Sequence, residues 1–262
     1  MNKKKYGMGL ATAVRGLSRY CMKGRDCKNQ ATALYWYPLV GAFLAIMALL
    51  PILVINAIIY RSIYCLNPEA SLLESAIFVA LLAYGSRGFH LDGFADTFDG
   101  FGGGYTKDRI MEIMKDSRVG SFGATALICL LIIKTAALAT IFKYNLLLAI
   151  PIVMLSRASL TLQCYISNYA KDSGLAKELC DGSNVRHIFS NLAFLFVPFY
   201  YLFVSGNFNI AIAMFMVMII STIAVHHISY KKLSGITGDI LGCTAEAVEM
   251  CISIAVAFMM LS

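Results

Sequence analysis

The chain has 262 residues, of which 59% are hydrophobic and 14% charged, whereas a typical soluble domain is about 25% charged. The basic residues, which give a net charge of +7, flank apolar runs and do not gather on one soluble face, which argues against a nucleic-acid-binding protein. The eight cysteines form no Cys-x-x-Cys pair, so we expect neither a zinc site nor a disulfide framework.

The first 37 residues are expected to form a cytoplasmic N-terminal arm. They contain three consecutive lysines but no apolar core long enough for a cleavable signal peptide. Apolar positions at Met8, Ala11, Val14 and Leu17 favour an amphipathic helix lying on the membrane surface. A disordered basic arm is the alternative.

The rest of the chain consists mainly of apolar runs of 18 to 23 residues, a length that matches a hydrocarbon layer about 30 Å thick. This pattern predicts an all-α, polytopic membrane protein with about seven transmembrane helices, six and eight being the alternatives. No repeat or linker divides the chain, so we expect one domain over 1–262. The expected spans are 38–60, 72–88, 120–142, 145–164, 187–205, 208–228 and 240–261.

Lysine and arginine gather in alternate connecting segments. Segments 1–37, 87–118, 165–186 and 229–239 carry eight, five, three and two of them, whereas the intervening segments carry only Arg61 and Lys143. Because cytoplasmic loops are enriched in basic residues, we expect the N-terminus and these four segments on the cytoplasmic side of a cell membrane.

The second span is expected to continue as one long helix beyond residue 88 and to leave the lipid near residue 100. Four glycines between Gly100 and Gly104 would end this helix, since glycine favours helix termination. Thr106 is a suitable N-cap for a further helix over 107–118.

Three aspartates mark this helix as the place where chemistry is expected. Asp92, Asp96 and Asp99 are spaced i, i+4, i+7 and lie within an arc of about 60° on one helix face. Their mutual repulsion is relieved by protonation or by a bound cation, and oxygen ligands alone favour Mg²⁺ or Mn²⁺. Six of the fifteen acidic residues fall between positions 92 and 116. The alternative is a solvated acidic face with no ligand.

Several charged residues lie inside the predicted spans, where they often mark a functional path. Lys134 and Arg157 suit a phosphate, or they form ion pairs with Glu246 or Glu249 that only fix packing. Asp239, which begins the last span, is either a ligand or a helix N-cap. His90 is a candidate base or a hydrogen-bonded spacer.

Two segments together resemble one enzyme family. Residues 88–100 read Gly-Phe-His-Leu-Asp-Gly-Phe-Ala-Asp-Thr-Phe-Asp-Gly, and residues 109–123 read Arg-Ile-Met-Glu-Ile-Met-Lys-Asp-Ser-Arg-Val-Gly-Ser-Phe-Gly. They resemble the cobalamin synthase family, the adenosylcobinamide-GDP ribazoletransferases. The similarity extends to Tyr37–Gly41, Lys134, Ser156–Arg157, Thr237–Gly242 and Glu246.

The resemblance implies a polytopic inner-membrane enzyme that needs Mg²⁺ and acts late in coenzyme B12 synthesis. It would join adenosylcobinamide-GDP to α-ribazole or its 5′-phosphate and release GMP at the cytoplasmic side. The family's N-terminal pattern is altered here, although Arg19 is retained. The implied metal ligands are Asp92, Asp96, Asp99 and Asp116, the catalytic residues are His90, Asp96 and Arg118, and the substrate-binding residues are Arg19, Lys134, Arg157, Asp239 and Glu246.

Two other functions fit parts of the pattern. A CDP-alcohol phosphotransferase also places aspartates on membrane helices around a divalent metal, but it carries Ala-Arg two residues after its Asp-Gly pair, where this chain has Gly103-Gly104. An ion or metal transporter would place acids near the membrane midplane in repeat-related helices. The aspartates here are expected at one interface.

Overall fold

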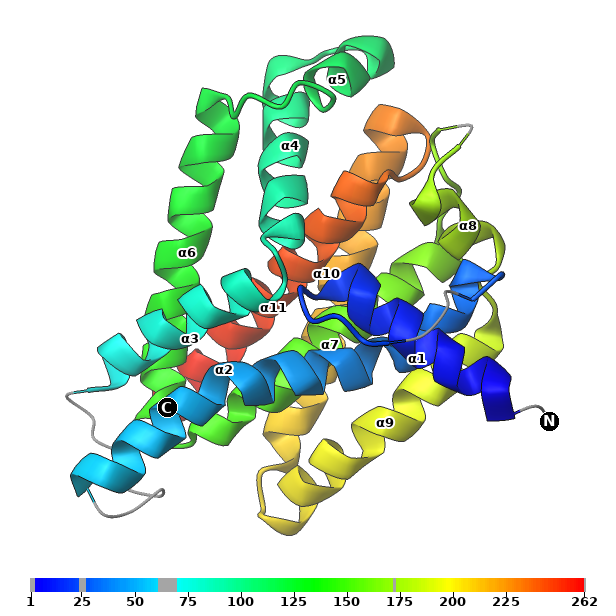
Figure 1. The fold of residues 1–262 in the computed structure, drawn as a ribbon. Helices are drawn as coiled ribbons and strands as arrows, with labels where there is room; N and C mark the ends of the chain where they lie inside the picture. The colour runs from blue at the N-terminus through cyan, green and yellow to red at the C-terminus, as the bar shows by residue number, and fades with distance from the viewer. Residues whose placement is uncertain (1–2, 24–26, 61–69, 172, 262) are drawn as a thin grey trace.

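The computed structural model describes residues 3–23, 27–60, 70–171 and 173–261, and its regular elements there are helices apart from one isolated bridge between Tyr169 and Ile236 (Figure 1). Helices are expected in lipid because each backbone N–H and C=O must find its partner within the segment. The all-α prediction is confirmed. Arg61, used above to predict orientation, lies outside the described residues.

Six helical segments among the described residues are long and apolar enough to cross a membrane, and a bent pair brings the number to seven. The predicted spans are therefore confirmed in kind and number, while their orientation stays a prediction. The long helices are α2 (Tyr37–Tyr60), α6 (Ser121–Phe142), α7 (Ala149–Ile166), α9 (Val185–Val204), α10 (Phe208–Leu233) and α11 (Gly238–Leu261). The shorter elements are α1 (Lys3–Leu17), η1 (Gln30–Trp36), α3 (Ser71–Gly85), α4 (Phe89–Gly103), α5 (Lys107–Ile113), η2 (Leu146–Leu148) and α8 (Leu175–Asp181).

The bent pair corrects the prediction of one continuous helix from residue 72 to about 100. Helices α3 and α4 meet at 90°. Arg87 and Gly88 between them have left-handed φ values of 58° and 69°, and the Gly88 N–H donates to the Ala83 carbonyl at 2.9 Å. This arrangement ends α3 in the way that glycine commonly ends helices. The acidic helix α4 therefore runs in a different direction from α3.

The predicted N-terminal helix is confirmed as α1, but its place on a membrane surface is untested. After α1 the Arg19 N–H donates to the Gly85 carbonyl at 2.8 Å, which ties the N-terminal arm to the break between α3 and α4. The predicted cap is also present, because the Thr106 hydroxyl accepts from the Arg109 N–H at 3.3 Å. The helix that it begins, α5, ends at Ile113 and is shorter than the predicted 107–118.

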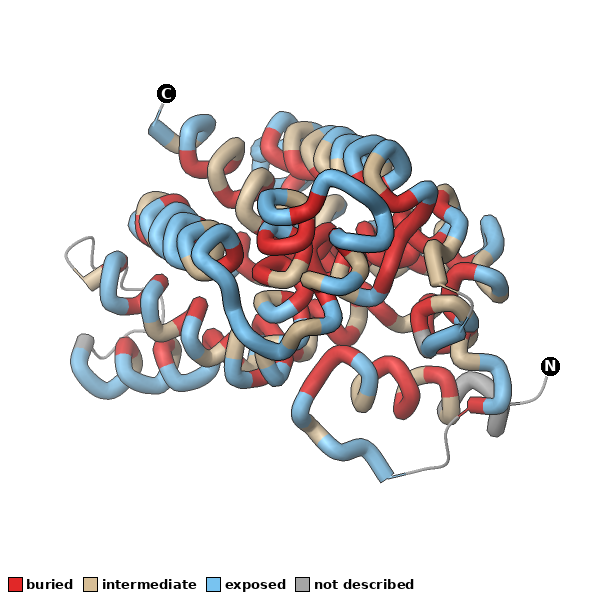
Figure 2. Tube along the Cα trace, turned by 90° about the horizontal axis from the view of Figure 1, so that it is seen from above, coloured by how far each residue is buried: buried red, intermediate tan, exposed pale blue. Residues whose placement is uncertain are grey.

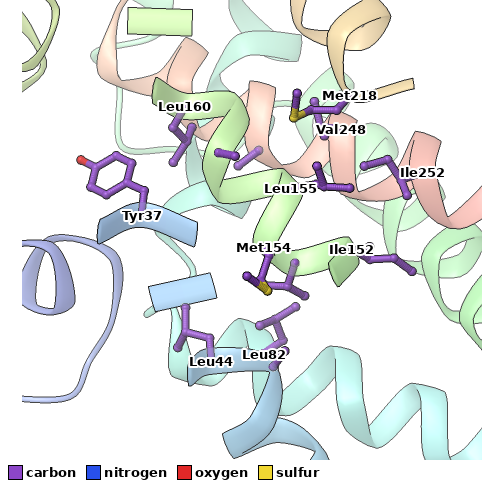
Figure 3. Close-up of a cluster of buried hydrophobic side chains, with 14 of the residues drawn as sticks. Tyr37, Leu44, Leu82, Ile152, Met154, Leu155, Leu160, Met218, Val248 and Ile252 are labelled. Carbon is purple, nitrogen blue, oxygen red and sulfur yellow. The ribbon is translucent and has the colours of Figure 1, made fainter. Parts of the chain in front are cut away.

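Helices α7 and α11 are the most buried of the long helices. The view from above shows that buried residues gather in the middle of the bundle (Figure 2). The apolar side chains of α7 and α11 meet those of α2, α3 and α10 in one core cluster. Figure 3 shows Leu155 on α7 and Ile252 on α11 within this cluster, and both side chains are fully buried. The outer helices α9 and α10 keep many apolar side chains exposed, as expected for surfaces that contact lipid.

One end of the bundle gathers parts of three of the four segments that were predicted to be cytoplasmic. Helices α5 and α8 and the turn between α10 and α11 lie toward the upper end in Figure 1. The C-terminal half of α4 reaches the same end. The candidate site residues on α4 and at the start of α11 are therefore brought near one another by the direction of the helices.

Candidate active site

The acidic residues gather where α4 crosses the start of α11. A Cβ added to Gly93 would lie 2.6 Å from the Asp239 carbonyl oxygen and 2.9 Å from its Cα, so the two backbones touch there. Only glycine permits this approach without displacing one helix. Asp92 and Asp96 lie on either side of Gly93 along α4, and the charges of Asp92 and Asp239 both act on the Asp96 carboxylate. We call Asp92, Asp96 and Asp239 the acidic cluster.

A second close contact holds the same crossing. A Cβ on Gly242 would lie 3.1 Å from the Cα and 3.2 Å from the carbonyl oxygen of His90. Two glycines, one on each helix, therefore set the distance between α4 and α11. The position of the acidic cluster follows from this packing.

Asp239 is not the N-cap of α11. The Thr237 hydroxyl accepts from the Ile240 N–H at 3.3 Å and lies 3.1 Å from Asp239 Oδ2, to which it donates. Thr237 thus performs the capping role that was one alternative for Asp239. The Asp239 side chain remains 29% exposed and available to a ligand.

The loop after α7 runs beside Asp239. The Ala170 N–H donates to the Ile236 carbonyl at 2.8 Å, and the Ile236 N–H donates to the Asn168 carbonyl at 2.9 Å. These bonds bring Lys171 Nζ to 3.8 Å from Asp239 Oδ2. Burial and the nearby Asp239 charge raise the pKa of Tyr169 in the same loop. Neither Tyr169 nor Lys171 was predicted as a site residue.

Asp99 has a different environment from its two neighbours on α4. It is 8% exposed, and its two oxygens accept from the N–H groups of Gly120 at 2.7 Å and Gly123 at 2.8 Å. A Cβ on either glycine would collide with this carboxylate. Asp99 therefore joins α4 to the N-terminus of α6, where a negative charge is favourable.

Asp116 and Arg118 form an ion pair in the loop between α5 and α6. Arg118 Nη2 lies 2.6 Å from Asp116 Oδ2, and the hydrogen bonds from Arg118 lower the pKa of Asp116 to about 2. Both residues line an open cavity of about 540 Å³ that also includes Asp99, Arg109 and Glu112. Asp116 is thus grouped with Asp99, and neither Asp92 nor Asp96 lines this cavity.

The charged residues of the spans form a second group, which we call the buried ion cluster. Lys134 Nζ lies 2.7 Å from Glu246 Oε2 and 2.7 Å from Glu249 Oε1, and Arg157 Nη1 lies 3.2 Å from Glu249 Oε2. All four side chains are at most 5% exposed. This is the geometry of the packing alternative, and a substrate-binding role for Lys134, Arg157 and Glu246 stays a prediction.

His90 and Arg19 are the remaining predicted site residues. His90 is buried, and within the described residues its Nδ1 has no hydrogen-bond partner, as is also true of Arg157 Nε and Nη2. The exposed Arg19 guanidinium lies 3.5 Å from the centre of the Tyr84 ring, close to the end of α3. Their predicted catalytic and substrate-binding roles are not tested by these positions.

The acidic cluster fits a hard divalent cation by its donor chemistry. Its ligands are carboxylate oxygens, and among the described residues Lys171 is the cation whose charge acts on both Asp96 and Asp239. Within the described ranges no three Asp, Glu, His or Cys side chains converge closely enough to hold a metal by themselves. Mg²⁺ commonly takes only one or two carboxylates and completes its shell with water and substrate phosphates, so the cluster suits Mg²⁺ in the presence of a phosphate ligand.

Comparison with known proteins gives one consistent result. A family model described as cobalamin-5-phosphate synthase matches residues 9–257. A relative from Chlorobium phaeovibrioides is 34% identical over 94% of this chain and 96% of its own length. One from Syntrophobacter fumaroxidans is 35% identical over 87% of this chain and 88% of its own length. Both relatives are named adenosylcobinamide-GDP ribazoletransferase. No solved structure matches the chain.

Proposed function

The chain belongs to the cobalamin-5-phosphate synthase family and is an enzyme of the adenosylcobinamide-GDP ribazoletransferase type, and we propose that its acidic cluster holds the divalent metal for this reaction. It converts adenosylcobinamide-GDP and ribazole to adenosylcobalamin. Whether the acceptor is α-ribazole or its 5′-phosphate, the proposed chemistry is the same. The other functions considered above, a CDP-alcohol phosphotransferase and a transporter, have no support from the family match.

The proposed reaction is a phosphoryl-group transfer. A ribazole hydroxyl forms a new bond to the phosphorus on the cobinamide side of the diphosphate, the bond from that phosphorus to the bridging oxygen breaks, and GMP leaves with this oxygen. The hydroxyl proton passes to a base. We propose that a carboxylate oxygen of the acidic cluster that is not bound to the metal accepts it.

The observation that carries the proposal is the contact between Gly93 and Asp239. It places carboxylates from two helices in one cluster, and such reactions depend mainly on positioning and on electrostatic stabilisation. A bound Mg²⁺ would supply neutralisation of the diphosphate and of the leaving GMP oxygen. Asp92 and Asp96 would hold it from α4 and Asp239 from α11, while Asp99 keeps α4 in place against α6.

We further propose that this end of the bundle faces the cytoplasm of a bacterial or archaeal cell. Parts of the basic segments 87–118, 165–186 and 229–239 lie at this end (Figure 1). The positive-inside rule then assigns the end its side. Cysteine labelling of Ser117→Cys in inverted and right-side-out vesicles of a variant lacking exposed Cys21 and Cys129 would check the assignment.

The test of the metal role is GMP release from adenosylcobinamide-GDP and α-ribazole by the purified protein in detergent with Mg²⁺. Asp96→Asn should lower turnover by at least about a hundredfold, since loss of a metal ligand removes several kcal/mol of transition-state stabilisation. Asp108→Asn is the matched control, because Asp108 is an exposed acid on α5 outside the cluster. Equal turnover of the two variants would contradict the assignment.

A further inference from the structure

Several cations of the bundle differ in how firmly they are held. Arg118 lies 2.6 Å from Asp116, and Lys134 lies 2.7 Å from two buried glutamates. Lys232 donates to the Phe101 carbonyl at 3.0 Å. By contrast, Lys171 lies 3.8 Å from Asp239, beyond hydrogen-bonding distance. Among the described residues, Lys171 is therefore a loosely paired cation that faces the cluster.

The backbone just before Lys171 is held in place, whereas the Lys171 side chain is loosely paired. Two backbone hydrogen bonds of 2.8 and 2.9 Å join the loop to the turn before α11. A Cβ on Gly235 in that turn would lie 2.6 Å from the Asn168 carbonyl oxygen, so the two segments are in direct contact. The side chain is 31% exposed and extends from this fixed point on a flexible stem.

Charge balance suggests what this lysine does. Its charge acts on Asp96 as well as on Asp239, in opposition to the three negative charges that act on Asp96. One lysine neutralises only part of the acidic cluster. A divalent cation there would repel the ammonium group, whereas the diphosphate of a substrate would attract it.

We propose that Lys171 is an exchangeable counter-ion: it neutralises Asp239 before metal binds, and it binds the substrate diphosphate once metal occupies the acidic cluster. This inference rests on the proposed function. It assigns a substrate-binding residue that the sequence motifs do not contain. It also predicts that removal of the Lys171 charge has opposite effects on two ligands.

The experiment measures both ligands separately. Binding of Mn²⁺ alone is followed by electron paramagnetic resonance on the purified full chain, and steady-state kinetics give KM for adenosylcobinamide-GDP at saturating Mg²⁺. In Lys171→Gln, Mn²⁺ should bind about fivefold more tightly, because a competing positive charge is removed. The KM for adenosylcobinamide-GDP should rise about tenfold, since a charge-assisted bond to phosphate is lost.

Two further variants make the result specific. Lys177→Gln removes a lysine from neighbouring α8, where Lys177 Nζ lies 3.6 Å from Asp181, and it should change neither quantity. Lys171→Arg keeps the charge and should restore the wild-type Mn²⁺ affinity. A purely structural role for Lys171 would weaken both ligands together, so weaker or unchanged Mn²⁺ binding in Lys171→Gln, or an unchanged KM, overturns the inference.

Asp96→Asn separates this inference from the proposed function. If Asp96→Asn loses Mn²⁺ binding and turnover while Lys171→Gln behaves like Lys177→Gln, the metal assignment holds and the counter-ion role is wrong. If Asp96→Asn keeps both Mn²⁺ binding and turnover, the metal assignment itself is wrong and the counter-ion role is overturned with it.

Discussion

The acidic cluster and the buried ion cluster contain the same kinds of side chain but have opposite charge balances. In the buried ion cluster, two cations and two carboxylates pair at 2.7 to 3.2 Å and are at most 5% exposed. The acidic cluster contains three carboxylates, and the nearby Lys171 lies 3.8 Å from one of them, Asp239. The Lys171 and Asp239 side chains are about one-third exposed. The balanced group is suited to holding helices together, and the unbalanced group is suited to binding a cation.

The different burial of the two clusters decides what the loss of one charge costs in each of them. A buried ion pair contributes little net stability when it forms, but removal of one partner leaves an uncompensated charge at high cost. A partly exposed cluster tolerates a change of charge, because water solvates what remains. Substitutions in the two groups should therefore affect different properties of the protein.

The largest expected effect on stability is that of Glu249→Gln. It removes the carboxylate that pairs with both Lys134 and Arg157. The change should lower the free energy of unfolding in detergent by about 3 to 5 kcal/mol. Glu112→Gln, which breaks an exposed pair with Arg109, is the control and should have little effect. Unchanged stability together with a raised KM would instead identify the buried ion cluster as a substrate site.

Gly93→Ala should have an intermediate effect on stability and a large effect on activity. The added methyl group would meet the Asp239 backbone at 2.6 Å and force α4 away from α11. Overpacking of this kind typically costs about 1 to 3 kcal/mol, and a misplacement of about 1 Å can cost about a hundredfold in rate.

Unfolding in detergent and GMP release measure the two consequences of Gly93→Ala. Gly16→Ala on α1 is the matched control, because a Cβ there meets nothing within 4 Å. A Gly93→Ala enzyme with normal turnover would show that the reaction does not need Asp239 beside Asp92 and Asp96.

Asp99→Asn should have the smallest effect on stability. Asp99 accepts hydrogen bonds from the N–H groups of both Gly120 and Gly123. The single oxygen of an asparagine amide can accept only one of these two bonds, so about 1 kcal/mol of stability is lost. Turnover well below the unfolding temperature should fall by no more than a few-fold. A loss as large as that of Asp96→Asn would restore Asp99 to the metal ligands predicted from spacing alone.

Hydropathy was sufficient to predict the helices of this bundle but not the geometry of its second hydrophobic segment. The spans are long apolar runs, and lipid leaves the backbone few alternatives to a helix. The 90° break was missed because Arg87 and Gly88 were read as part of a continuous helix. A glycine after the last apolar position is a termination signal and could have been used.

The candidate site was predicted in part. Regular helical spacing placed Asp92, Asp96 and Asp99 on one face, but it could not show that Gly120 and Gly123 would engage Asp99. The available signal was the pair of glycines, Gly120 and Gly123, on either side of the start of α6 at Ser121. Lys171 carried no sequence signal, because its position depends on a bridge between segments more than 60 residues apart.

The most direct test of the account is equilibrium Mn²⁺ binding to the purified protein without substrate, compared between Asp239→Asn and Asp116→Asn. Asp239 touches α4 beside Asp92 and Asp96, whereas Asp116 pairs with Arg118 in a separate cavity. The account predicts that Asp239→Asn weakens Mn²⁺ binding at least about tenfold and that Asp116→Asn leaves it unchanged. Weakened binding in Asp116→Asn with normal binding in Asp239→Asn would contradict it.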